Sequence, residues 1–379
     1  MTLILFFSCY FVDNVYYKMG GACLLSKSWV VLPIFSYLFF ELKKKMRVGI
    51  IGQGVIGSST ALAILEHFPN SSVTLFGDRP FEKTCSFGPA GLFRLDKFEN
   101  KELARKSFER FAKIDQKFPG NETGIKLLSG HIQSDIKENL LGQEKNYGDI
   151  VYNFRWLTQL EIELLFPNPS KYCIHYTAYA SEGRVYVPWL RKECEKLGAK
   201  YITREITTLK DLELDEPKYD VIINAAGLNA GKIAGDDDTV FPVRGIGFEV
   251  EAPWHKHFNY RDFTTFTIPM TNSVLVGSVK QPNRSDTEIT DEDRNDIWER
   301  YLKLQPNFKN VKKIAEWSGI RPDRPSLRLE KTIKKNSKGQ DYLLVHNYGH
   351  GGNGFTLGWG CALEVVKFIQ DSLQQNSKI

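Results

Sequence analysis

Three glycines spaced as Gly52-x-Gly54-x-x-Gly57 follow directly on the apolar run Arg47–Ile51. In this pattern the first glycine allows a tight turn, the second lets the backbone approach a pyrophosphate, and the third lets a helix pack on the strand. Asp78 lies 21 positions after Gly57, where a carboxylate can bind ribose hydroxyls. The spacing indicates a site for an adenine dinucleotide and leaves NAD and FAD both open.

A second glycine-rich turn lies near the C-terminus, in the segment Tyr342–Thr356, and leads into a helix expected over Trp359–Leu373. A bound FAD needs contacts at its isoalloxazine end as well as at its pyrophosphate, so two such turns favour a flavin. In that arrangement the cofactor carries the redox step, while the protein positions the substrate and tunes the ring.

Other chemistries have little support in the sequence. No Ser/His/Asp set or paired-carboxylate site is recognisable, which disfavours a hydrolase. The six cysteines include no CxxC pair, so neither a disulfide framework nor a zinc site is expected, and the metal prediction is none. The close pair His255-Lys-His257 is read as a surface turn. A composition of 42% hydrophobic and 25% charged residues is that of a folded chain and excludes collagen-like and disordered classes.

The elements expected around these residues predict an α/β fold. The strand Arg47–Ile51, a helix over Ser58–Phe68 and a strand over Val73–Phe76 form a βαβ unit. We predict a discontinuous Rossmann-like FAD-binding domain with an inserted substrate domain built on a mainly antiparallel sheet. The first comprises residues 46–96, 186–237 and 323–379, and the second comprises residues 97–185 and 238–322. Within the latter, residues 125–180 are expected to form antiparallel strands, and Asp291–Leu304 a helix.

Residues 1–45 form an N-terminal extension with two apolar runs, Leu3–Val12 and Trp29–Phe40, each shorter than a membrane span. Five lysines against Asp13 and Glu41 put most of the net charge of +5 into this segment. Three interpretations stay open: a signal peptide, a signal-anchor or interfacial segment, and translation that begins at Met46. The last is favoured, and no stable membrane insertion or nucleic-acid partner is expected.

From Met46 onward the chain resembles the D-amino-acid oxidase family, and within it the branch that oxidises D-aspartate. The resemblance rests first on Leu344-Val-His-Asn-Tyr-Gly-His-Gly-Gly-Asn-Gly354, followed by Gly360-Cys-Ala362. Phe241-Pro-Val-Arg-Gly245, Ala252-Pro-Trp254 and Gly319-Ile-Arg-Pro-Asp-Arg-Pro325 support it. These motifs cover nearly the whole chain after the extension.

The resemblance implies an FAD enzyme in which hydride passes from the substrate Cα to flavin N5. The imino acid then hydrolyses to a 2-oxo acid and ammonia, and O₂ reoxidises the flavin to give H₂O₂. No protein base is required, so no catalytic residue is assigned. The cofactor-binding residues that it implies are Gly52, Gln53, Gly54, Val55, Ile56, Gly57, Asp78, Arg79, Thr84, Cys85, Ser86, Gly91, Leu92, Ile206, Gly351, Gly352, Gly354, Phe355 and Thr356.

The same resemblance implies that Arg321 forks onto the substrate α-carboxylate beside Gly352. Lys280 and Arg261 resemble the basic residues of the acidic-substrate branch, which favours D-aspartate and D-glutamate. Phe266 stands where the family usually has a tyrosine, so a hydroxyl that bonds the carboxylate is missing. The alternatives are a neutral D-amino-acid or glycine oxidase, an NAD-dependent dehydrogenase, and a nucleotide-binding protein without catalysis.

The C-terminal residues Ser377-Lys378-Ile379 resemble the Ser-Lys-Leu peroxisomal address, with isoleucine for leucine. A peroxisomal import receptor is therefore a candidate partner, beside the acidic D-amino acid and O₂. Cytosol and peroxisomal matrix are both expected locations, and secretion is disfavoured.

Overall fold

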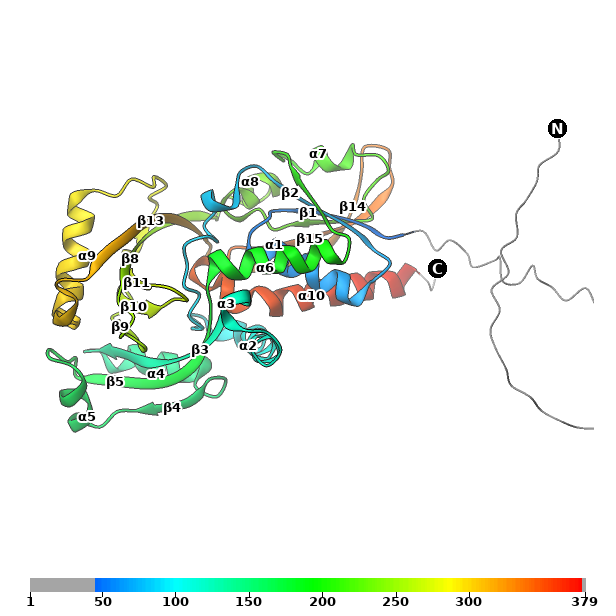
Figure 1. Cartoon of the computed structure of the whole chain (residues 1–379). Helices are drawn as coiled ribbons and strands as arrows, with labels where there is room; N and C mark the ends of the chain where they lie inside the picture. The colour runs from blue at the N-terminus through cyan, green and yellow to red at the C-terminus, as the bar shows by residue number, and fades with distance from the viewer. Residues whose placement is uncertain (1–44, 377–379) are drawn as a thin grey trace, which may run out of the picture. The chain divides into compact units, whose positions relative to one another are not determined.

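Two β-sheets organise the residues that the structure, a computed structural model, describes, namely 45–376 (Figure 1). The first has six strands in the order β14-β15-β7-β1-β2-β6 and is parallel except for the pairing of β14 with β15. Its strands are β1 (Arg47–Ile51), β2 (Ser72–Gly77), β6 (Lys200–Thr203), β7 (Val221–Asn224), β14 (Arg328–Lys335) and β15 (Asp341–Tyr348). The predicted βαβ unit is present as β1, α1 (Val55–His67) and β2.

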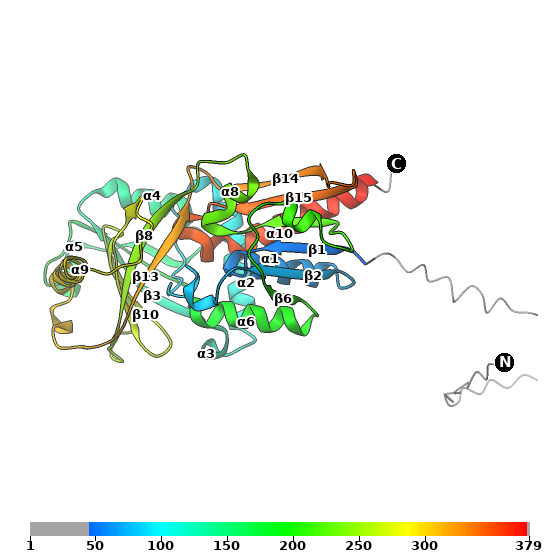
Figure 2. The same cartoon turned by 90° about the horizontal axis from the view of Figure 1, so that it is seen from above.

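Helices cover both faces of this sheet, as a parallel sheet requires. One face packs against α1, α6 (Gly183–Lys196) and α10 (Gly354–Asn376), with Val48 and Ile50 pointing into that core. The other face lies under α7 (Lys210–Glu213) and α8 (Ala230–Ala234), and there Ile51 points into a second core. Figure 2 shows the sheet from above, with β14 at one edge and β6 at the other.

The second sheet has nine strands and is antiparallel except for the pairing of β3 with β9, in agreement with the predicted mainly antiparallel sheet. Its order is β12-β8-β11-β10-β9-β3-β5-β4, and β13 also pairs with β8. The strands are β3 (Ile125–Ser134), β4 (Tyr152–Trp156), β5 (Tyr172–Ser181), β8 (Phe241–Glu251), β9 (Phe258–Arg261), β10 (Thr265–Pro269), β11 (Val274–Gly277), β12 (Gln281–Pro282) and β13 (Lys312–Asp323).

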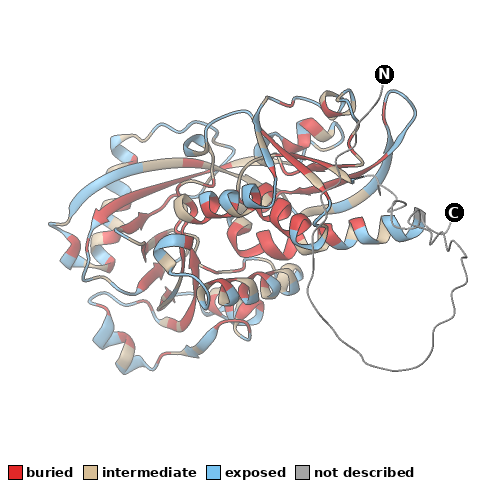
Figure 3. Ribbon diagram, turned by 45° about the vertical axis from the view of Figure 1, so that its right-hand side comes forward, coloured by how far each residue is buried: buried red, intermediate tan, exposed pale blue. Residues whose placement is uncertain are grey.

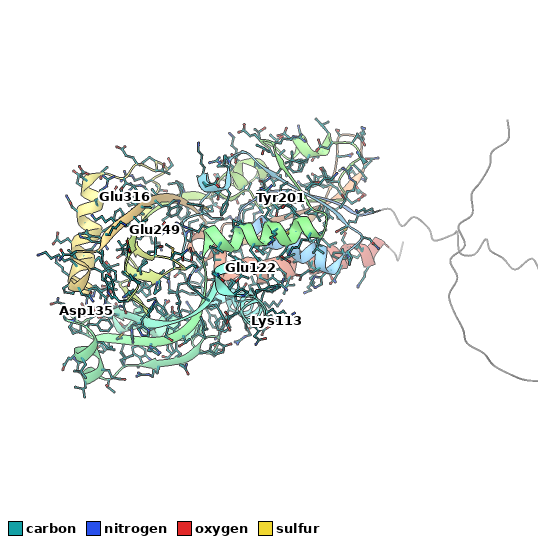
Figure 4. All side chains as sticks on the ribbon, viewed as in Figure 1. Lys113, Glu122, Asp135, Tyr201, Glu249 and Glu316 are labelled. Atoms are coloured by element: carbon teal, nitrogen blue, oxygen red, sulfur yellow. The ribbon has the colours of Figure 1, made fainter. Side chains whose placement is uncertain are left out.

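Helix α9 has the predicted bounds Asp291–Leu304 and packs on this sheet. Its start is fixed by a capping box, in which the Thr290 hydroxyl accepts from the Asp293 amide and the Asp293 carboxylate accepts from the Thr290 amide. Arg294 donates to both carboxylate oxygens of Glu316 on β13, the residue labelled beside α9 in Figure 4. The capping box therefore fixes where α9 begins, and the ion pair of Arg294 with Glu316 holds the helix against β13.

Residues 125–180 depart from the expectation of strands alone. Between β3 and β4 lies α4 (Lys137–Tyr147), and between β4 and β5 lies α5 (Gln159–Leu165). Helix α5 is only 7 residues long and begins at a capping box of Thr158 with Glu161. Helix α4 packs against β3 and β5, and α5 is too short to show an apolar periodicity, so neither helix is evident from the sequence pattern.

The cores of the two sheets are continuous. Phe93 is fully buried and meets Phe108 of α2 (Lys101–Asp115) edge to face, with ring centroids 5.0 Å apart. Phe108 in turn meets Tyr179 of β5 at 5.0 Å. The buried residues coloured red in Figure 3 accordingly run through both sheets and α10, while α5 and the outer face of α9 are exposed. The remaining helix is α3 (Gly120–Thr123).

Every strand of the six-stranded sheet lies within the segments 46–96, 186–237 and 323–379, while the exact domain boundaries stay a prediction. The interpretations of the N-terminal extension concern residues 1–45, of which 1–44 lie outside the described residues. The C-terminal tripeptide, residues 377–379, also lies outside them. Among the described residues, no helix is long and apolar enough to cross a membrane. Over the same range Cys85, Cys173, Cys194 and Cys361 are free thiols.

Candidate functional site

A cavity of about 1250 Å³ lies where the carboxyl ends of β1 and β2 face the second sheet. This is the edge at which open α/β sheets bind ligands. The predicted cofactor residues that line it are Gly52, Gln53, Gly54, Val55, Ile56, Asp78, Arg79, Thr84, Cys85, Ser86, Gly91, Leu92, Ile206, Gly351, Gly352, Gly354, Phe355 and Thr356. Gly57 does not line the cavity. A Cβ there would overlap the Gly52 carbonyl, so Gly57 serves the packing of α1 on β1.

The N-terminus of α1 is open toward this cavity. Gly54 caps the helix without a side-chain hydrogen bond, and the first turn holds no acidic residue. The Val55 amide donates to the Ser86 hydroxyl at 3.1 Å, which brings the loop after β2 over the helix end. Free amides and the positive end of the helix dipole suit a pyrophosphate at this point.

Asp78 lies at the end of β2 and is held by its neighbour. Arg79 Nε donates to Asp78 Oδ1 at 2.8 Å, and this hydrogen bond keeps the pKa of Asp78 below its usual range. The carboxylate is therefore an ionised acceptor at neutral pH, as ribose binding needs. Gln53 donates to the carbonyls of Leu75 and Ile202 and so ties the glycine turn to β2 and β6.

The second glycine-rich turn forms the far wall of the cavity, and the N-terminus of α10 begins there at Gly354. His350 is buried beside it, and burial lowers its pKa to about 3, so the ring is neutral. Several buried polar atoms of lining residues have no hydrogen-bond partner, which a bound ligand would supply. They are Gln143 Oε1, Ser318 Oγ, Arg321 Nη1, Asn347 Oδ1 and His350 Nε2.

These features together fit an adenine dinucleotide with a ring system at one end. Two helix N-termini, an ionised carboxylate and unpartnered buried donors line one continuous cavity. The match of predicted to lining residues supports FAD as the group that the cavity holds.

Arg321 lies on β13 in the part of the cavity near Gly352. Burial lowers the pKa of its guanidinium, although the group stays charged at neutral pH because the free value is so high. Nη1 is buried without a partner, which leaves it ready for an anion. The side chain lies across Gly245 of β8, where a Cβ would overlap the guanidinium.

The other predicted substrate residues divide into two groups. Gly352, Phe266 and Lys280 line the cavity, Lys280 as an exposed side chain. Arg261 does not line it. Its guanidinium donates instead to the carbonyl oxygen of Asn168 and, at 3.4 Å, to Gln133.

The position of Arg261 follows from strand geometry. Tyr260, the residue before it on β9, lines the cavity, and successive side chains of a strand point to opposite faces. The structure therefore does not bring Arg261 to the substrate side, and the expectation that it binds substrate gains no support here.

Two lining residues that the sequence reasoning missed are Tyr260 and Arg94. Tyr260 stacks on Phe266 with ring centroids 4.8 Å apart. Arg94 follows the Gly91-Leu92 loop and forms an ion pair with Asp96. Neither residue stands in a local sequence motif. Alternation along β9 places Tyr260 and Arg261 on opposite faces, so the strand pattern allows one of the two to line the cavity.

Comparisons with known proteins agree with this geometry. The model of the family described as "FAD dependent oxidoreductase" matches residues 47–367. The chain is 56% identical over 331 residues to D-aspartate oxidase 1 of Caenorhabditis elegans, covering 87% of this chain and 98% of the relative. It is 31% identical over 335 residues to human D-aspartate oxidase, covering 86% and 95%.

Among solved structures, glycine oxidase from Bacillus cereus ATCC 14579 shares the fold, with a TM-score of 0.71 at 19% identity. The superposition covers 86% of this chain and 96% of that chain. The family match spans both sheets and every residue that lines the cavity, and with the D-aspartate oxidase relatives it leads to one conclusion. The chain belongs to the D-amino-acid oxidase family of FAD dependent oxidoreductases.

Proposed function

We propose that this chain is a D-aspartate oxidase, which oxidatively deaminates acidic D-amino acids to 2-oxo acids and releases ammonia and H₂O₂. The observation that carries the proposal is the buried, unpartnered Nη1 of Arg321 within a cavity that fits FAD. Relatives named D-aspartate oxidase at 53–56% identity supply the substrate class.

Arg321 binds the α-carboxylate in this proposal. A guanidinium presents two parallel N–H groups to a carboxylate, and burial strengthens the interaction because water does not compete. This holds the substrate in one orientation, which is the main task of a site whose redox chemistry belongs to a cofactor. Bound FAD supplies the electron acceptor, and O₂ takes the electrons to form H₂O₂.

Lys280 supplies attraction for a second carboxylate. Its ammonium is exposed at the cavity, so it acts as a point charge that solvent partly screens. D-Aspartate and D-glutamate both carry the second carboxylate, and the proposal covers both.

The test is peroxide release by the purified full chain, with D-aspartate, D-glutamate, D-alanine, glycine and L-aspartate as substrates. The proposal expects a flavin absorbance spectrum and turnover of the acidic D-amino acids at a higher kcat/KM than D-alanine. A chain that is colourless and does not take up added FAD contradicts it, and so does faster turnover of D-alanine. An NAD-dependent dehydrogenase is disfavoured because the matched family is FAD dependent.

We further propose that Ser377-Lys378-Ile379 addresses the chain to peroxisomes through an import receptor, with the cytosol as the alternative location. A compartment that removes H₂O₂ suits a peroxide-forming oxidase. The test compares the cellular location of the full chain, tagged at an internal loop, with that of a chain lacking the last three residues. An unchanged distribution contradicts the proposal.

A further inference from the structure

A second arginine lines the cavity near Arg321, and no prediction from the sequence gave it a role. Arg94 lies in the segment Gly88–Leu95, between the loop after β2 and helix α2. Its side chain is 18% exposed, so most of it is out of contact with bulk water. A cation in such a place needs either a structural partner or a ligand.

The backbone around Arg94 is held from two sides. On the side of the second sheet, the preceding amide of Phe93 donates to the Tyr179 carbonyl at 2.9 Å. On the side of the glycine-rich turn, the Arg94 carbonyl accepts from Asn353 Nδ2 at 2.8 Å and from Thr356 Oγ1 at 3.0 Å. The side chain therefore starts from a fixed point, which favours a positioned contact over a mobile surface charge.

The guanidinium of Arg94 has one ionic partner and one aromatic partner. Nη1 donates to Asp96 Oδ1, and the guanidinium carbon lies 5.1 Å from the centre of the Phe263 ring. Burial alone would lower the pKa of Arg94, but the Asp96 carboxylate and the nearby tyrosines together outweigh burial and raise the pKa. The group is thus a permanent cation. The donor in the contact with Asp96 is Nη1, and within the described residues Nε and Nη2 make no side-chain hydrogen bond.

Phe263 reaches this place through a turn with an unusual backbone. Asp262 and Phe263 have φ angles of 48° and 59°, a backbone conformation that residues other than glycine rarely adopt. Asp262 is fixed there because its carboxylate accepts from the Ser134 hydroxyl at 2.7 Å. Backbone strain of this kind tends to occur where a side chain must be presented to a site.

Arg94 and Arg321 both line the part of the cavity around Gly352. A Cβ built on Gly352 would lie 4.0 Å from both Arg321 Cδ and Asp96 Oδ2, so these two atoms flank the glycine. Tyr260 feels the charge of both arginines, and the charge of Arg94 contributes to the lowered pKa of Arg321 after burial. Two guanidinium groups in one desolvated region repel each other, and a ligand with one carboxylate for each of them relieves that repulsion.

We propose that Arg94 binds the side-chain carboxylate of the acidic substrate while Arg321 binds its α-carboxylate. The proposal rests on the proposed function and adds a specificity-determining residue to it. Asp96 positions the Arg94 guanidinium and shares its charge, and Lys280 at the exposed edge contributes attraction without a fixed contact. D-Alanine, which lacks the second carboxylate, leaves Arg94 unused.

The test measures KM and kcat of the full holoenzyme on D-aspartate and D-alanine for Arg94→Met and Arg94→Lys. Arg94→Met is expected to raise KM for D-aspartate at least tenfold, to change kcat less than threefold, and to leave kcat/KM for D-alanine unchanged or higher. Arg94→Lys is expected to restore part of the loss, because it keeps the charge and loses the fork. The matched control is Arg105→Met, an α2 arginine paired with Asp149 outside the cavity.

Arg94→Met leaves Asp96 without its partner, so the double variant Arg94→Met/Asp96→Asn is measured as well, and each variant is checked for its flavin spectrum. Equal loss on both substrates, or no loss on D-aspartate, overturns the role of Arg94. If the single variant does not fold, the double and lysine variants decide by the same criterion. A wild-type chain that does not oxidise D-aspartate overturns the proposed function itself, which is a different result.

Discussion

The guanidinium of Arg321 on β13 lies across the backbone of Gly245 on β8, in space that any side chain at 245 would occupy. In the register of the two strands Gly319 stands opposite Gly245 and Arg321 opposite Val243, so the arginine crosses the ladder diagonally. Gly245 therefore makes the room that the guanidinium of Arg321, the proposed carboxylate-binding group, occupies.

Gly245→Ala should displace the Arg321 guanidinium and raise KM for D-aspartate about tenfold or more, since one charge-assisted contact is worth roughly 1.5–3 kcal/mol. FAD binding should persist, because the residues expected to hold the cofactor lie elsewhere. Steady-state kinetics with a flavin spectrum measures both. The control is Gly142→Ala on α4, where an added methyl meets nothing within 4 Å. An unchanged KM for Gly245→Ala would contradict the role given to Arg321.

Lys280→Met should lower the preference for D-aspartate over D-alanine. Because the ammonium is exposed, the expected rise in KM is about threefold to tenfold, and it should shrink as ionic strength increases. The ratio of kcat/KM for the two substrates at low and high salt measures this. Arg261→Lys serves as the control, since that side chain bonds to Asn168 away from the cavity. Equal effects of the two substitutions on substrate preference would contradict the proposal that Lys280, and not Arg261, attracts the second carboxylate.

Phe266→Tyr should strengthen substrate binding. The ring lies along the cavity wall, stacked on Tyr260 at 4.8 Å, with its end close to Gly277. A hydroxyl there adds a donor for a carboxylate, worth roughly 1.5 kcal/mol, so KM for D-aspartate should fall about tenfold with little change in kcat. The measurement is a substrate titration of both chains. A KM that rises would mean that the hydroxyl collides with β11 instead of reaching the substrate.

Stability should fall as the pH drops below the ordinary histidine range. His350 has a folded pKa lowered by burial to about 3 from 6.5. Between these values the unfolded chain binds a proton that the folded chain excludes, so the stabilisation is complete above pH 6.5 and is lost toward pH 3. The slope is about 1.4 kcal/mol per pH unit for one such group.

Burial also lowers the pKa of His131, His255 and His346 to about 4, so their contributions have the same sign. His350→Asn removes one group that binds a proton only in the unfolded chain. Between pH 4.5 and 6.5 the unfolding free energy of this variant should therefore change less with pH than that of the wild type. Urea titrations at several pH values measure this. Parallel curves for the two chains over that range would show that His350 binds its proton in the folded state.

The glycine turn and its βαβ unit could be predicted from sequence because each residue acts locally. Gly52 makes the turn, Gly57 packs α1 on β1, and the strands on either side are short apolar runs. Helix α9 was predictable for a similar reason, since the capping signal at Thr290 is local. Arg321 could be singled out because its flanking residues, Gly319, Pro322 and Pro325, match the motif of the family that the chain resembles.

Arg94 could not be found this way. Its place in the cavity depends on contacts from Tyr179 of β5 and Asn353 of the glycine-rich turn, which lie far away in the sequence. Arg261 lies outside the cavity for a different reason. A basic residue was expected at about the right point of the chain, but a strand turns every second side chain away, and a difference of one residue decides the face.

The buried core that the two sheets share limits how ligands can enter. Two sheets that shared only a thin interface could swing apart about a hinge and expose the cavity. Here one buried core contains residues of both sheets, Val48 and Ile50 of β1 as well as Ile174 of β5, so separating the sheets would expose a large apolar area to water. We therefore expect side chains and loops at the rim of the cavity to move when a substrate enters. We also expect residues 45–376 to unfold in one cooperative step, because neither sheet can separate without exposing the shared core.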